Sequence, residues 1–383
     1  MANNQQLLLG EGAGSAPAVF VEDVFSTYLY TGNGSTQTIT NNIDLSTKGG
    51  LVWVKRRDAA VQSALNDTGL AGLVLGSSST SGQVYQAQGI TSFAASGFSI
   101  GSNNQYNTNA GTYVSWTFRK QRKFFDFVTW TGDGNTSKTI THSLGVVPGC
   151  IITKMTSGIN NWNTYHRSLA NTQAVQLNLT NAVSSSANYW NNTTPTSAVF
   201  TVGTDGNVIG ETYVAYLFAH DAGGFGAAGT DNVISCGTAS ATAGTWSDVN
   251  VGFEPQWVLL KNSTAGGTYN PSGSAGSEDW FVIDTMRGAT AATNSNTATV
   301  ALSANSSIAE YNDVWFGLTS TGFSFKGVTS GSDNFIYIAI RRGPMKVPTV
   351  GTSVYTGTTR TGTGASAAVT GVGFPPDLVI TRN

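Results

Sequence analysis

A short stretch with strict alternation of bulky and small or polar residues occurs three times in the chain. It reads TYVSWTFRK at Thr112–Lys120, TYVAYLFAH at Thr212–His220 and, more loosely, NFIYIAIRR at Asn334–Arg342. A period of two residues predicts a β-strand whose two faces have different surroundings, one of them a core and the other water or a second sheet. The bulky face of the first copy comprises Val114, Trp116 and Phe118.

A second motif is an apolar strand that follows a short turn and ends in a basic residue. Its four copies end at Lys55, Lys154, Lys261 and Arg382, at spacings of 99, 107 and 121 residues. A unit of this length matches one β-sandwich, whereas propeller blades and solenoid repeats are shorter. Glycine-rich turns before each copy add to the prediction of antiparallel strands.

The segment before each alternating stretch also reads as a strand followed by a turn. Phe98, Phe200 and Phe323 each lead such a segment, and Gly, Asn and Asp follow. The pattern predicts a hairpin in which the alternating stretch is the second strand.

These repeats predict an all-β chain of tandem antiparallel β-sandwiches, three complete and a partial fourth. We expect each copy to fold on its own core, with loop-like linkers such as His220–Asn232 between copies. The expected divisions are an N-terminal anchor segment at 1–22, repeat 1 at 23–121, repeat 2 at 122–222, repeat 3 with its leading linker at 223–343, and a linker with the start of repeat 4 at 344–383.

The fourth copy stops at Asn383, directly after its basic strand. Three explanations are open: the sequence is cut relative to the natural protein, the tail completes a sheet in a neighbour, or the tail is disordered. We favour the first, because the motif keeps its quality to the last residue.

Composition narrows the class of protein. The 383 residues include 19 Lys and Arg against 21 Asp and Glu, so the net charge of −2 argues against nucleic acid as a partner. The basic cluster Arg119–Lys123 fits a solvated linker better than a binding patch. No apolar run is long enough for a membrane helix, and the N-terminus does not resemble a signal peptide, so we expect no membrane insertion. Cys150 and Cys236 are expected to be buried free thiols rather than a disulfide.

Candidate catalytic groups are few. His142, His166 and His220 lack metal-ligand spacing, and the acidic pairs Glu278–Asp279 and Glu310 with Asp313 do not recur among the repeats. We therefore expect no enzymatic activity, no metal and no cofactor.

Carbohydrate binding is the remaining chemistry, because sugar C–H faces stack on exposed aromatic rings beside polar groups. Aromatic loops with that composition predict a glycan site, and the alternative is that their rings cap the sandwich cores. The residues of the predicted site are Trp162, Tyr165, Trp190 and Tyr311.

Three strings carry a family resemblance: GGLVWVKRRD at Gly49–Asp58, DTMRGAT at Asp284–Thr290 and the stretch from Ser92 to Lys120. Together they resemble a repeat domain of bacteriophage virion proteins, common in phages of marine bacteria including cyanophages. Repeats 1 and 2 depart from it, since they lack the equivalent of Arg287–Gly288. The resemblance implies jelly-roll or concanavalin-like sandwiches, which occur in tandem in tail fibres and other virion structural proteins.

The function that this resemblance implies is a tail fibre or adhesin within the virion, made in the host cytoplasm without a signal peptide. Its expected partners are other virion proteins through the N-terminal segment, further copies of itself in a homotrimer, and host surface glycans. One alternative is a capsid decoration, head fibre or other virion protein without a receptor-binding role. A more distant alternative is a polysaccharide depolymerase.

Overall fold

The computed structural model describes residues 17–70, 72–242, 245–264, 279–289, 299–313, 315–326, 332–343, 345–346, 355–362, 364, 369, 372 and 378–381. Within these residues the chain is all-β, built from several antiparallel sheets, as the alternation predicts. None of the helices in the described part is long and apolar enough to span a membrane. The residues fall into two units, 1–344 and 345–383.

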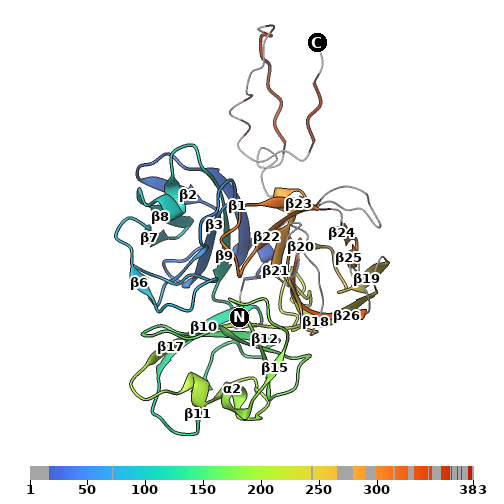
Figure 1. The fold of residues 1–383 in the computed structure, drawn as a ribbon. Coiled ribbons are helices and arrows are strands. Elements are labelled where there is room, and N and C mark those ends of the chain that lie inside the picture. Colours follow the sequence, from blue (N-terminus) through green and yellow to red (C-terminus); the bar gives the residue numbers. More distant parts are fainter. Residues whose placement is uncertain are drawn as a thin grey trace, which may run out of the picture. The chain divides into compact units, whose positions relative to one another are not determined.

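Repeat 1 is a sandwich of two sheets (Figure 1, blue to cyan). Its larger sheet has the order β1 (Phe25–Thr31), β9 (Thr112–Arg119), β3 (Gly50–Arg56) and β4 (Ala64–Asp67). The smaller sheet has the order β2 (Gln37–Thr40), β8 (Gly97–Ile100) and β7 (Ile90–Ala94). A two-stranded ribbon, β5 (Leu73–Val74) with β6 (Val84–Tyr85), extends from β4, and the short helix α1 (Asn104–Asn107) precedes β9.

Repeat 2 has the same plan (Figure 1, green). Its larger sheet has the order β10 (Phe125–Thr131), β17 (Thr212–Phe218), β12 (Cys150–Met155), β13 (Asn163–His166), β14 (Gln173–Gln176) and β15 (Ser184–Ser185). The smaller sheet pairs β11 (Ser137–Thr141) with β16 (Val199–Gly203). The one-turn helix α2 (Ala187–Trp190) lies beside β16.

Repeat 3 follows the plan again (Figure 1, yellow to orange). Its larger sheet has the order β18 (Ile234–Thr242), β26 (Ser332–Arg341), β20 (Pro255–Asn262), β21 (Trp280–Asp284), β22 (Thr299–Ser303) and β23 (Tyr311–Asp313). The smaller sheet has the order β19 (Trp246–Asn250), β25 (Gly322–Lys326) and β24 (Phe316–Thr319). Three short 3₁₀ turns complete the described elements: η1 (Val21–Asp23), η2 (Thr204–Gly206) and η3 (Thr285–Arg287).

The alternating stretch is the second strand of each larger sheet: β9, β17 and β26. The predicted hairpin is wrong. In repeat 1 the preceding strand β8 pairs with β2 and β7 in the opposite sheet, and β16 and β25 are placed likewise. The chain crosses from one sheet to the other between these strands. The prediction failed because the turn signals in the sequence mark a reversal of chain direction without specifying the partner strand.

Both faces of the alternating strand are buried. In β9, Tyr113 belongs to the interior of the repeat 1 sandwich, with Val52 and Val54 of β3. Val114, Trp116 and Phe118 point the other way and join a core that contains residues of all three repeats. The bulky face of the alternating strand is therefore part of the contact between repeats.

Repeats 1 and 3 each have a core of their own, as expected, and a further core is shared by all three repeats. The ring of Phe118 lies 5.6 Å from that of Phe218 in repeat 2 and 5.5 Å from that of Trp257 in repeat 3, centroid to centroid. Burying each such side chain contributes about 1.5–3 kcal/mol. Separating the repeats would expose these rings, so the shared core stabilises the contact between them.

The predicted linkers are also packed. Phe225, in the middle of the His220–Asn232 segment, is buried with its ring 6.2 Å from that of Phe124. Its neighbour Gly226 donates a backbone hydrogen bond to Val19. In the Arg119–Lys123 cluster, Lys120 forms an ion pair with Asp126 (2.8 Å) and lies over the Phe127 ring. Although the His220–Asn232 segment has few apolar residues, a single aromatic residue, Phe225, anchors it in the shared core.

Two further predictions concern the ends of the chain. Of the N-terminal segment, residues 1–16 lie outside the described residues, while Val21 is fully buried in the shared core. The partial fourth sandwich falls mostly outside the described residues too. Its described residues, 355–362 and 378–381 among them, form no strand, so this sandwich stays a prediction. Cys150 and Cys236 are buried free thiols, as predicted.

Candidate functional site

The three repeats contact one another in a cyclic order through equivalent backbone positions. The residue before β6, β15 or β23 donates its N–H to the carbonyl just after the basic strand of the next repeat. These bonds are Gln83 to Thr156 (2.7 Å), Val183 to Ser263 (3.1 Å) and Glu310 to Arg57 (2.8 Å). The third bond connects repeat 3 to repeat 1, so the set is closed.

Hydrogen bonds of the alternating strands repeat the same cycle. In each case the alternating strand of one repeat contacts the last residue of β4, β13 or β21 in the preceding repeat. The contacts are the Tyr216 hydroxyl to Asp67 Oδ2 (2.8 Å), His166 Nε2 to the Tyr337 carbonyl oxygen (3.1 Å) and Trp116 Nε1 to Asp284 Oδ2 (2.9 Å). Burial lowers the pKa of His166 to about 4, which keeps the ring neutral and able to donate from Nε2.

The basic residue that ends this strand in repeats 1, 2 and 3 is buried and points to the preceding repeat, while Arg382 of the fourth copy lies outside the described residues. The Nζ atoms donate to backbone carbonyls: Lys55 to Ser307 (2.9 Å), Lys154 to Thr80 (3.1 Å) and Lys261 to Thr180 (2.8 Å). Burial lowers the pKa of Lys55 to about 8 and that of Lys154 to about 8. The recurrence of Lys in the sequence thus reflects an assembly contact between repeats.

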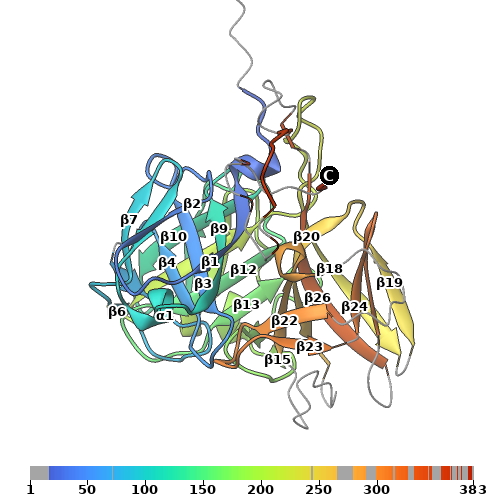
Figure 2. The same cartoon turned by 90° about the horizontal axis from the view of Figure 1, so that it is seen from above.

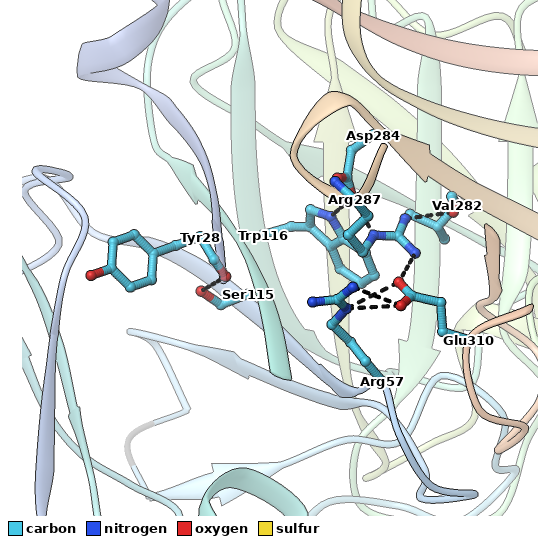
Figure 3. Close-up of polar contacts among 8 residues, drawn as sticks. All are labelled: Tyr28, Arg57, Ser115, Trp116, Val282, Asp284, Arg287 and Glu310. Atoms are coloured by element: carbon cyan, nitrogen blue, oxygen red, sulfur yellow. Dashed lines mark hydrogen bonds and ion pairs between the residues drawn. The ribbon is translucent and has the colours of Figure 1, made fainter. Parts of the chain in front are cut away.

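An ion cluster occurs where repeat 3 meets repeat 1 (Figure 3). Arg57 donates to both carboxylate oxygens of Glu310 (2.7–3.0 Å). Arg287, whose side chain is fully buried, donates to Asp284 (2.7 Å), Glu310 (3.3 Å) and the Val282 carbonyl (2.7 Å). Its guanidinium also lies 5.4 Å from the Trp116 ring. Two cations and two carboxylates compensate one another there, as buried charges require.

Three of the four predicted glycan residues are buried, which corrects the expectation of exposed rings. Trp162 is fully buried, and its indole N–H donates to the carbonyls of Gly76 and Ser79 in repeat 1 (both 3.1 Å). Trp190 packs edge-on against Tyr165 at 5.8 Å between centroids, and both are buried. A sugar has no access to these ring faces. The alternative interpretation, in which the rings are packed in the cores, describes these three residues.

Tyr311 is half-buried and packs against the core of repeat 3, with its hydroxyl 3.4 Å from Ser303 Oγ. The structure therefore does not bring the four predicted residues together on one surface. Ligand binding at Tyr311 stays a prediction.

An exposed aromatic residue that the sequence reasoning missed is Tyr85, 73% exposed at the end of β6. It borders a groove of about 290 Å³ on repeat 1, lined by Gly72, Tyr85, Gln86, Ala87, Ile90, Thr91, Ser92 and Phe93. Val84–Tyr85 reads locally as an ordinary strand fragment. The sequence feature that could have predicted the exposure of Tyr85 is the surrounding run of Gly and Gln, which is too polar to bury an aromatic ring.

The candidate catalytic carboxylates are engaged in structural contacts. Asp279 is buried and accepts hydrogen bonds from Ser303 and Asn305 (both 2.7 Å), and Glu310 belongs to the ion cluster. Glu278 lies outside the described residues, and so does the side chain of Asp313. Among the described residues, no group of three or more His, Cys, Asp or Glu side chains could hold a metal ion.

Comparison with known proteins places the chain in a family. No curated protein matches the sequence. The family described as a domain of unknown function (DUF7483) matches residues 21–344, a span that includes all three repeats and the buried Val21. The family model covers the three repeats as a single domain, and the same three repeats share one core in the structure. The chain therefore belongs to the DUF7483 family of domains of unknown function.

Proposed function

We propose that this chain is a bacteriophage virion structural protein, a tail-fibre or adhesin module that binds without catalysis. The observation that carries the proposal is the closed cycle of contacts that joins three sandwiches on one core. Such a body resists local opening, because each repeat is covered by both others. A module on the outside of a particle needs that resistance. The resemblance of GGLVWVKRRD and DTMRGAT to virion repeat domains supports the same assignment.

The buried lysines and the ion cluster add support. Their hydrogen-bonding groups are directed at neighbouring repeats, and the candidate acids Asp279 and Glu310 are held in structural contacts. General acid–base chemistry needs a carboxyl that can reach a substrate. These residues thus favour a structural role over a depolymerase.

Particle labelling tests the proposal. Fab fragments raised against the purified chain would be added to particles of the phage that encodes it and imaged by electron microscopy. We expect Fab density on the tail fibres. Density on the capsid would replace the tail-fibre assignment with a decoration role, and absence of the chain from purified particles would refute the proposal. The homotrimer is a separate proposal, which sedimentation of the full chain would test.

A further inference from the structure

The groove beside Tyr85 lies on the outer side of repeat 1. Figures 1 and 2 both place β6 and β7 on the side of this repeat turned away from the strands of repeat 3. The groove is formed where the β5–β6 ribbon meets β7 of the smaller sheet. The contacts that join the three repeats do not use Tyr85, so assembly of the domain leaves the groove accessible.

The Tyr85 ring lies against the backbone at Gly72. Gly72 has a φ of +75°, and a Cβ atom at this position would lie 3.0 Å from Cε2 of the ring. The ring therefore rests against a backbone segment that only glycine leaves open. A supported aromatic ring with most of its surface in water is a flat apolar platform that loses little side-chain entropy when a ligand stacks on it.

The rest of the lining is uncharged and mixed: Gln86, Thr91 and Ser92 are polar, whereas Ala87, Ile90 and Phe93 are apolar. Gln86 donates from Nε2 to Gln105 (2.9 Å), which orients its amide, while its Oε1 is buried. Thr91 and Ser92 present exposed hydroxyl groups. Among the described residues no charged side chain lines the groove, which disfavours phosphate and other anionic ligands. A ligand with an apolar face and several hydroxyl groups fits this lining.

The equivalent positions in the other repeats differ. Tyr85 pairs with Leu73, and the strands β15 and β23 pair in the same way with β14 and β22. Counting from the equivalent backbone donors Gln83, Val183 and Glu310 places Ser185 and Asn312 where repeat 1 has Tyr85. The sandwich plan therefore does not require an aromatic residue at this position, and another cause must account for it.

We infer that the Tyr85 groove is a carbohydrate-binding site that takes one ring of a neutral oligosaccharide. The sugar stacks its C–H face on Tyr85 and directs hydroxyl groups to the exposed residues Thr91 and Ser92. A volume of about 290 Å³ is at the small end of ligand pockets, which suits a single sugar ring rather than an extended chain. The inference rests on the proposed function and specifies its glycan-contacting residue.

Binding of the full chain to a printed array of neutral and acidic bacterial oligosaccharides tests the inference. We expect binding to at least one neutral glycan. Tyr85→Ser, which introduces the residue that repeat 2 carries, should weaken binding about tenfold or more. Tyr85→Phe keeps the ring and should stay within about threefold of the original chain. Ile209→Ser changes a similarly exposed residue of repeat 2, 74% exposed, and should have no effect.

Equal thermal stability of the variants would show that they fold. Two outcomes overturn the inference: no neutral glycan bound by the original chain, or equal binding by Tyr85→Ser. A preference for acidic glycans would also overturn it, because the lining has no cation. Particle labelling does not depend on Tyr85, so a failed glycan site and a failed virion assignment are distinguishable.

Discussion

Two interfaces of the domain use the same backbone bond with different side chains. Where repeat 1 meets repeat 2, Gln83 donates to Thr156; where repeat 3 meets repeat 1, Glu310 donates to Arg57. Only the second pair adds a bidentate ion pair. Repeats 1 and 2 are neighbours in sequence, so the chain itself holds them together, whereas repeats 1 and 3 are separated by a whole repeat. We interpret the ion cluster as compensation for that missing connection.

The largest expected effect comes from removing the buried arginine of the ion cluster. Arg287→Met leaves Asp284 and part of Glu310 without a cationic partner, which should lower the free energy of unfolding by about 3–5 kcal/mol. Leu70 follows Asp67 as Arg287 follows Asp284, three residues later, so Leu70→Met is the matched control, with a cost below about 1.5 kcal/mol. Urea unfolding measures both. Equal losses in the two variants would contradict a special role of the interface between repeats 3 and 1.

A smaller effect is expected at the interface between repeats 1 and 2. Tyr216→Phe removes the hydroxyl donor from Asp67, whose pKa is raised by burial, and should cost about 1–3 kcal/mol at pH 7. The cost should shrink as the pH falls toward the raised pKa, since a protonated carboxyl no longer requires this donor. Unfolding at pH 7 and pH 4.5 measures the difference. A loss that does not vary with pH would show that Asp67 is not the group affected.

The buried Lys55 and Lys154 predict a pH dependence shared by the two interfaces compared above. Their pKa of about 8 lies below the ordinary value of 10.5, so the folded state disfavours their charged form. That penalty is complete below pH 8 and is relieved as the pH rises toward 10.5, so stability should increase in this window. Allowing for solvent screening, we expect about 1–2 kcal/mol for each lysine.

Denaturant unfolding between pH 7 and pH 9.8 measures this rise. Lys55→Met and Lys154→Met should each remove part of it, because one of these lysines lies at each of the two interfaces. The window ends near pH 10, where buried tyrosines with raised pKa values, such as Tyr30 and Tyr216, begin to favour the unfolded state. A stability that stays level or falls between pH 8 and 9.8 would contradict the prediction.

The candidate site shows that local sequence patterns do not predict whether an aromatic ring is exposed. Trp162 and Trp190 occur in polar stretches of the sequence, yet each is buried because a neighbouring strand or repeat covers it. Tyr85 occurs in a strand, yet it is exposed because none of the segments that the structure describes covers its ring. The exposure of a ring depends on what lies opposite it, and that partner can be distant in sequence.

The sequence by itself determined the all-β class, the three repeats and the alternation in TYVSWTFRK, because strand periodicity and turn chemistry are local properties. It also marked Lys55, Lys154 and Lys261 as recurrent. Only the tertiary structure decided that the bulky face of β9 packs on the other repeats, that the contacts form a closed cycle, and that Arg57 meets Glu310 across 253 residues of chain. Alternation shows that the two faces of a strand differ, but the partner of each face is set by the packing of the whole domain.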